Sequence, residues 1–159
     1  MDHFEKYLAL GYRYLTIRNR SEKEIRDYFI KKKVAPVVIE KLVATLYEQK
    51  FLNDETFARS WITSRARFRP KGKVALRIEL AQKGISKDII EQVMSEENEE
   101  LPDELTQAKS LIERRIVKVK DLPRQEMYQK VGGFLARRGF SWEISKKAID
   151  SSLAQLHNE

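Results

Sequence analysis

One apolar pattern occurs three times along the chain. Each copy has five apolar residues, separated by steps of four, five, four and four residues. The copies are Ile25, Phe29, Val34, Val38 and Leu42; Leu76, Leu80, Ile85, Ile89 and Val93; and Val131, Leu135, Phe140, Ile144 and Ala148. Steps of four place side chains on one face of an α-helix, and the step of five crosses a turn between two helices. The pattern therefore predicts a tandem array of helix pairs.

The periods of the pattern, 51 and 55 residues, leave room for a third helix in each repeat. Capping residues and prolines predict helices at residues 3–18, 21–32, 36–50, 54–68, 71–83, 87–97, 104–118, 124–138 and 142–156. We expect an all-α fold of three three-helix repeats, at residues 1–53, 54–100 and 101–159. Such repeats form an elongated, curved array with a long face for extended partners, and the pattern does not determine its hand.

Helix starts are marked by short polar residues. Ser21 with Glu24 three residues later predicts a capping box. Asp54 is the expected N-cap of the helix that it begins, and Ser86 and Ser141 are expected to cap the last helix of their repeats.

Glycines mark the turn after the middle helix. Gly84 and Gly139 occupy the place where a left-handed backbone ends a helix without strain. Lys33 stands at that place in the first repeat, so its turn must differ or strain a residue with a side chain. The pair Gly132-Gly133 weakens the middle helix of the third repeat, and the sequence offers no physical reason for it.

Composition narrows the classes of function. The chain has no cysteine, which excludes disulfides, thiolate zinc sites and a cysteine nucleophile. No apolar run reaches the roughly 20 residues that span a bilayer, and the first residues do not read as a signal peptide. Phosphate-binding glycine loops, serine elbows and metal-spaced histidines are absent, and His3 and His157 lie at the termini. We expect a cytoplasmic monomer that does not bind membranes, is not an enzyme and needs no cofactor.

Charge is unevenly distributed. Residues 59–87 hold nine Lys or Arg against one acid, whereas residues 88–105 hold eight acids and no base. Residues 109–147 hold eleven bases and four acids. A nearly unmixed basic stretch forgoes ion pairs within its helices, so we expect phosphate or an acidic protein surface to compensate it. The candidate binding residues are Arg59, Arg65, Arg67, Arg69, Lys71, Lys73, Arg77, Lys83, Arg114, Arg115, Arg137 and Arg138.

Two further features bear on binding. The carboxylates of residues 96–104 form an acidic block that lacks the spacing of a calcium loop, so a solvated linker is preferred to a metal site. Most aromatic residues recur at helical spacing and are expected in the core, but Phe68, between two arginines, is a candidate surface contact.

Several segments carry a family pattern. They are Arg18–Ile25, Tyr47–Glu55 with Phe57-Ala58, Ser64–Arg67, Lys71-Gly72, Ile78–Ser86 and Phe134–Phe140. In order and spacing they resemble the RecX family of recombination regulators over residues 5 to 150. The central segments are the specific ones. Phe51, Asn53 and Lys33 depart from the residues usual in the family.

The resemblance implies a negative regulator of the RecA recombinase, in DNA repair, recombination and the SOS response. Such a protein binds the RecA filament on single-stranded DNA, in its groove or at its end, and inhibits filament growth, ATP hydrolysis and strand exchange. It also implies binding to single-stranded DNA, with double-stranded DNA as a further candidate. The alternative is a helical-repeat DNA-binding protein with no recombinase partner, in which a helix pair acts like a helix-turn-helix. A metal-dependent enzyme that uses the acidic block is the third alternative.

Overall fold

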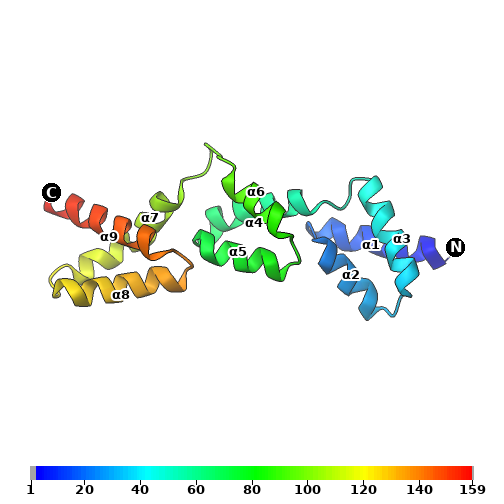
Figure 1. The fold of residues 1–159 in the computed structure, drawn as a ribbon, viewed down its shortest axis with the longest axis horizontal. Helices are drawn as coiled ribbons and strands as arrows, with labels where there is room; N and C mark the ends of the chain where they lie inside the picture. The colour runs from blue at the N-terminus through cyan, green and yellow to red at the C-terminus, as the bar shows by residue number, and fades with distance from the viewer. Residues whose placement is uncertain (1–2, 159) are drawn as a thin grey trace. The chain divides into compact units, whose positions relative to one another are not determined.

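The computed structural model describes residues 3–158, and these form nine helices and no strand. The helices are α1 (His3–Ile17), α2 (Glu22–Lys31), α3 (Pro36–Glu48), α4 (Asp54–Phe68), α5 (Lys73–Gln82), α6 (Lys87–Ser95), α7 (Glu104–Val119), α8 (Arg124–Arg137) and α9 (Trp142–His157) (Figure 1). Every predicted helix is present, with its ends within two residues of the prediction. The all-α fold of three-helix repeats is confirmed. The repeat boundaries and the curvature of the array stay predictions.

Burial follows the apolar pattern closely. In each copy the first, second, third and fifth residues are buried, and the fourth is half-buried. The half-buried residues are Val38, Ile89 and Ile144, each on the first turns of the last helix of its repeat. The same positions therefore form the core in all three repeats.

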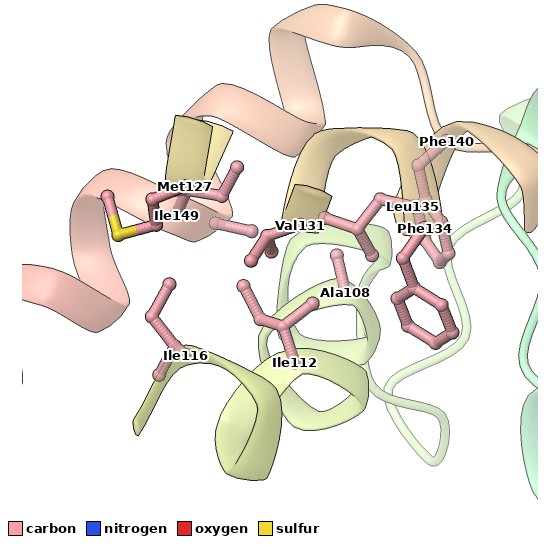
Figure 2. Packing of buried hydrophobic residues seen from close by; sticks show 10 residues of the cluster. Ala108, Ile112, Ile116, Met127, Val131, Phe134, Leu135, Phe140 and Ile149 are labelled. Atoms are coloured by element: carbon pink, nitrogen blue, oxygen red, sulfur yellow. The ribbon is translucent and has the colours of Figure 1, made fainter. Parts of the chain in front are cut away.

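The chain packs as two compact units, and each has a hydrophobic cluster. In the first repeat, Ile25, Phe29, Leu42 and Leu46 are fully buried, with side chains of α1 packed against them. In the third repeat, Ile112 of α7, Leu135 of α8 and Ile149 of α9 are fully buried in one cluster (Figure 2). Truncating such a residue to alanine typically costs about 2–5 kcal/mol.

Most of the predicted caps are confirmed. The backbone N–H of Glu24 donates to Ser21 Oγ at 3.2 Å, and the N–H of Ser21 donates to Glu24 Oε1 at 3.1 Å, which completes the capping box. Ser86 and Ser141 each accept a bond of 3.3 Å from the N–H three residues later.

The prediction that Asp54 caps α4 is wrong. Asn53 is the cap, since its Oδ1 accepts from the N–H of Thr56 at 3.1 Å. Asp54 Oδ1 instead accepts from the N–H of Glu22 at 2.8 Å, at the start of α2. Asparagine and aspartate can both cap a helix. Here Asn53 does so, because Asp54 is bonded to Glu22, which is distant in sequence.

The turns after the middle helices have the predicted left-handed backbone. The φ angles are +80° at Gly84, +88° at Gly139 and +61° at Lys33. Lys33 therefore adopts the strained conformation, which is one of the two outcomes that its place in the sequence allowed. Lys50, with φ +63°, does the same without having been predicted.

Close packing adds a second reason for glycine at two of these turns. A Cβ atom on Gly84 would lie 2.5 Å from Cβ of Lys23 on α2, and one on Gly139 would lie 2.1 Å from Cβ of Ala75 on α5. Each turn thus packs on the middle helix of the preceding repeat. Lys33 is exposed, so close packing does not exclude a side chain at this position, and the positive φ angle alone disfavours one.

The start of α5 depends on the third repeat. Gly72 N–H donates to the carbonyl of Arg138 at 2.8 Å, and Val74 N–H donates to the carbonyl of Gly139 at 3.1 Å. Lys73 N–H donates to Glu104 Oε2 at 2.6 Å. These N–H groups have no partner within their own helix, and α5 has no capping side chain like Ser21 of α2. Residues 62–79 accordingly pack with the third repeat, and the end of α5 and α6 pack with the first.

We expect Gly139→Ala and Gly84→Ala to destabilise the protein. The positive φ alone costs an alanine about 1–2 kcal/mol, and the overlap with Ala75 or Lys23 adds to it. Lys33→Gly is the matched control, because the same backbone angle occurs there without close packing, and it should leave stability unchanged or raise it slightly. Urea denaturation measures all three. Wild-type unfolding free energies in both alanine variants would contradict the packing described.

Candidate functional site

Part of the predicted basic surface is already neutralised inside the fold. Glu79 of α5, whose side chain is only 14% exposed, pairs with Arg65 Nη2 at 3.0 Å and with Lys71 Nζ at 3.2 Å. The lack of ion pairs within helices had predicted an external anion for the whole basic stretch. That inference is incomplete, because Arg65 and Lys71 find a carboxylate in the tertiary structure.

Lys83 and Arg59 lie in the compact unit that contains the first repeat, and both also have interaction partners. Lys83 Nζ lies 3.4 Å from Glu24 and 5.5 Å from the ring centre of Trp61. Arg59 pairs with Glu55 one turn before it on α4. Both cations therefore have structural partners, whatever else they bind.

Three cations near the α4–α5 turn remain available, and we call them the α4–α5 cations: Arg67, Arg69 and Lys73. All three are exposed, and none forms an ion pair with the residues that the structure describes. Phe68 between the two arginines is 80% exposed, as its place in the sequence predicted. Arg77 is half-buried on α5.

The α5 start brings the two predicted basic clusters together. The hydrogen bonds from Gly72 and Val74 place Arg138 directly beside the segment that carries Lys71 and Lys73. In the sequence the two clusters lie in successive repeats, and their spacing does not show whether they meet. The structure joins their backbones at Gly72 and Arg138.

The arginines of the third repeat gather around Phe134. The guanidinium carbon of Arg115 lies 3.7 Å from the ring centre and that of Arg138 lies 5.2 Å from it. Arg114 and Arg137 are exposed. A cation on an aromatic ring keeps its charge and can still bind an anion.

A pocket of about 360 Å³ between α7 and α8 adds two cations that sequence reasoning missed. Its lining residues are Arg114, Arg115, Lys118, Val119, Lys130 and Val131. Within residues 3–158 no acidic side chain lines this α7–α8 pocket, although Lys130 pairs with Glu126 at 3.8 Å, and its cations suit a phosphate group. Lys118 stands four residues after Arg114, a helical spacing that was visible in the sequence. Lys130 comes from another helix and only the fold brings it there.

The acidic block has structural roles at its end. Asp103 caps α7 by accepting from the N–H of Thr106 at 2.7 Å, and this bond holds the pKa of Asp103 below its usual value. Glu104 caps α5 through its bond to the N–H of Lys73. Within residues 3–158, no group of three or more His, Asp or Glu side chains is placed to hold a metal ion.

Burial and ion pairing compete at Glu24. Burial alone would raise the pKa of this carboxyl, but hydrogen bonds from Arg18 and from the backbone of Ser21 outweigh it, helped by the charges of Arg18 and Lys83. The pKa of Glu24 is therefore lowered. The ionised carboxylate ties α2 to the end of α1 and to Lys83.

Comparison with known proteins agrees with this architecture. Models of the first, second and third three-helix domains of RecX match residues 8–46, 53–94 and 102–149. The chain belongs to the RecX family. The second RecX domain contains the α4–α5 cations, and the third contains the α7–α8 pocket.

Two RecX relatives show the extent of the likeness. The regulatory protein RecX of Bacillus pumilus (strain SAFR-032) is 34% identical over 139 residues, which cover 87% of this chain and 52% of the relative. That of Bacillus subtilis (strain 168) is 32% identical over 149 residues, 94% of this chain and 56% of the relative. The chain thus spans about half the length of the relatives it matches.

Solved RecX structures confirm the fold. The crystal structure of RecX from Lactobacillus salivarius superposes with a TM-score of 0.85 at 21% identity, over 96% of this chain and 97% of that one. Another crystal structure of a regulatory protein RecX gives a TM-score of 0.79 at 23% identity, over 94% of this chain and 72% of that one. Among the described residues, no helix is both long enough and apolar enough to cross a membrane.

We expect Glu24→Gln to lower the unfolding free energy at neutral pH by about 1 kcal/mol. Glutamine keeps the capping geometry but loses the charge that pairs with Arg18 and Lys83. Because folding lowers this pKa, the carboxylate stabilises the protein above the unfolded value of 4.5, and the benefit is lost as the pH falls through the folded pKa.

Urea denaturation of wild type and variant across pH 3 to pH 7 measures the difference. Asp27→Asn, which removes an exposed pair with Lys23, is the control and should have a smaller effect. A Glu24→Gln deficit that does not shrink toward low pH would contradict the role given to its charge.

Proposed function

We propose that this protein regulates RecA by binding the RecA filament on single-stranded DNA. The observation that carries the proposal is that Arg67, Arg69 and Lys73 are exposed and have no carboxylate partner among the described residues, while the backbone next to Lys73 is bonded to Arg138 of the third repeat. Like charges held together repel one another and favour an anionic partner. Membership of a family whose curated members are named regulatory proteins supports regulation rather than catalysis.

In this proposal the protein restrains filament growth, ATP hydrolysis and strand exchange, from the filament groove or its end. It hydrolyses nothing itself, so its effect on ATP turnover requires RecA and DNA together. It works as a cytoplasmic monomer without a cofactor, in DNA repair, recombination and the SOS response. The proposed contacts are the α4–α5 cations, Arg77 and the third-repeat arginines. Arg59, Arg65, Lys71 and Lys83 contribute less, because carboxylates already neutralise them.

A DNA-binding protein without a recombinase partner is the second candidate. The α7–α8 pocket favours it, since the pocket is lined by four cations, of which Lys130 also pairs with Glu126 at 3.8 Å, and clustered cations suit a phosphate. The two functions differ in whether the protein prefers the filament to naked single-stranded or double-stranded DNA.

We expect the triple variant Arg67→Ala, Arg69→Ala, Lys73→Ala to bind RecA filaments far more weakly than wild type. Arg65 is kept, because removing it would strip the carboxylate of Glu79 of a half-buried partner and confuse binding with folding. Co-sedimentation with filaments on single-stranded DNA, over a range of salt concentrations, measures the affinity. The slope of log affinity against log salt should become shallower by roughly 0.7 for each phosphate that the variant no longer neutralises.

A triple variant of three exposed cations on α1 and α3, Lys6→Ala, Arg13→Ala, Lys41→Ala, removes the same charge and serves as the control. Equal weakening in the two triple variants would show that net charge, not this surface, drives binding. Equal affinity of the wild type for filaments and for naked DNA would instead favour the second candidate.

A further inference from the structure

The groove between the middle and last helices differs between the first and third repeats. In the first repeat Arg26 pairs there with Glu22 at 2.8 Å and with Glu40 at 2.6 Å. Aligning the apolar pattern places Gly132 at the position of Arg26 and Lys146 at that of Glu40. The ion pair that bridges these helices in the first repeat is therefore absent from the third.

An apolar groove opens in its place between α8 and α9, with a volume of about 770 Å³. Its lining residues are Arg124, Gln125, Tyr128, Gln129, Gly132, Gly133, Ala136, Trp142 and Lys146. The two glycines and the alanine make a floor without long side chains. A Cβ atom on Gly132 would lie 3.1 Å from Cζ3 of Trp142, so Gly132 lets the indole lie close against α8.

Two aromatic rings stand in this α8–α9 groove. Trp142 is 58% exposed, although it is a large apolar side chain at the start of a helix. The ring of Tyr128 is 6.3 Å from it at 61°, and the hydroxyl of Tyr128 donates to Asp150, which fixes that ring. The indole therefore presents a flat, exposed surface beside the two glycines and the alanine of α8.

The two charged side chains that line the groove, Arg124 and Lys146, are both positive, although Asp150 lies beside it in contact with Tyr128 and Lys146. Arg124 lies 5.2 Å above the ring of Tyr128, and Lys146 is exposed, with only a surface pair to Asp150. None of the acidic residues that the structure describes lines the groove, and Gln125 and Gln129 add exposed amides that can donate and accept hydrogen bonds. The complementary ligand has a flat apolar group and negative charges beside it.

We propose that the α8–α9 groove binds an unstacked base of single-stranded nucleic acid, with Trp142 as the stacking platform and Arg124 and Lys146 facing the neighbouring phosphates. Exposed aromatic rings beside cations are the usual means of binding single strands without sequence preference, and each stacked base contributes about 1–3 kcal/mol. The inference rests on the proposed function and deepens it by giving the DNA strand a second contact, distinct from the α4–α5 cations.

The test uses the full chain in a Trp61→Phe background, where Trp142 is the one remaining tryptophan. The probe is an oligothymidylate of about 20 residues, longer than typical single-strand site sizes. Titration should quench the emission of Trp142. The Trp142→Ala variant lacks this emission, so its binding is measured from the fluorescence anisotropy of labelled oligothymidylate. It should bind about 5-fold to 150-fold more weakly than wild type, which corresponds to the loss of one stacked base.

A second variant keeps the inference testable if Trp142→Ala unfolds. Gly133→Leu fills the groove, and its Cβ would meet only the flexible end of Arg137 at 3.4 Å, so the helix can accept it. It should weaken binding as Trp142→Ala does. Ala154→Leu, exposed on α9 outside the groove, is the control and should change nothing. A base-free deoxyribose-phosphate oligomer should bind wild type and Trp142→Ala equally.

Unquenched emission, with unchanged oligothymidylate affinity in both groove variants, would overturn the inference. So would loss of filament binding with oligothymidylate affinity intact, which would assign the groove to a protein side chain. Failure of the wild type to co-sediment with RecA filaments, with quenching still observed, would contradict the proposed function and leave this inference standing.

Discussion

The start of α5 is the constraint on which much of this structure depends. A helix begins with N–H groups that have no partner within the helix, and leaving them unsatisfied costs free energy. The first repeat solves this locally, with the capping box of Ser21 and Glu24. The second repeat takes its acceptors from the third, through the carbonyls of Arg138 and Gly139 and the carboxylate of Glu104. Gly72 has no room for a side chain at this contact.

This constraint also arranges the charges. Docking of the α8–α9 turn on α5 places Arg138 beside Lys71 and Lys73, which repulsion alone would keep apart. Glu79 offsets part of that repulsion by pairing with Arg65 and Lys71. The pairing leaves the α4–α5 cations exposed beside a rigid helix start. The positive charge that is available to bind a partner therefore depends on which cations the fold neutralises. Counting Lys and Arg in the sequence overstates this available charge.

Features set by neighbours in sequence were predictable, and those set by distant neighbours were not. Helix ends, the capping box and the left-handed glycines follow from local backbone chemistry, and the repeated apolar pattern identified the core. The partner of Asp54 lies 32 residues away at Glu22, and that of Lys83 lies 59 residues away at Glu24. Spacing along one helix cannot reveal such contacts. Lys130 in the α7–α8 pocket was missed for the same reason. Gly132 lies between these cases. Its effect is on Trp142 of another helix, which spacing does not show, but aligning the repeats does reveal that Gly132 replaces Arg26.

The borrowed capping of α5 is the central claim, and amide hydrogen exchange measured by NMR tests it most directly. If the N–H groups of Gly72, Lys73 and Val74 donate to the third repeat, they should exchange as slowly as the core amides of α8, because they open only when the third repeat opens. Exchange of these three amides at the rate of an exposed loop, while α8 stays protected, would contradict the claim.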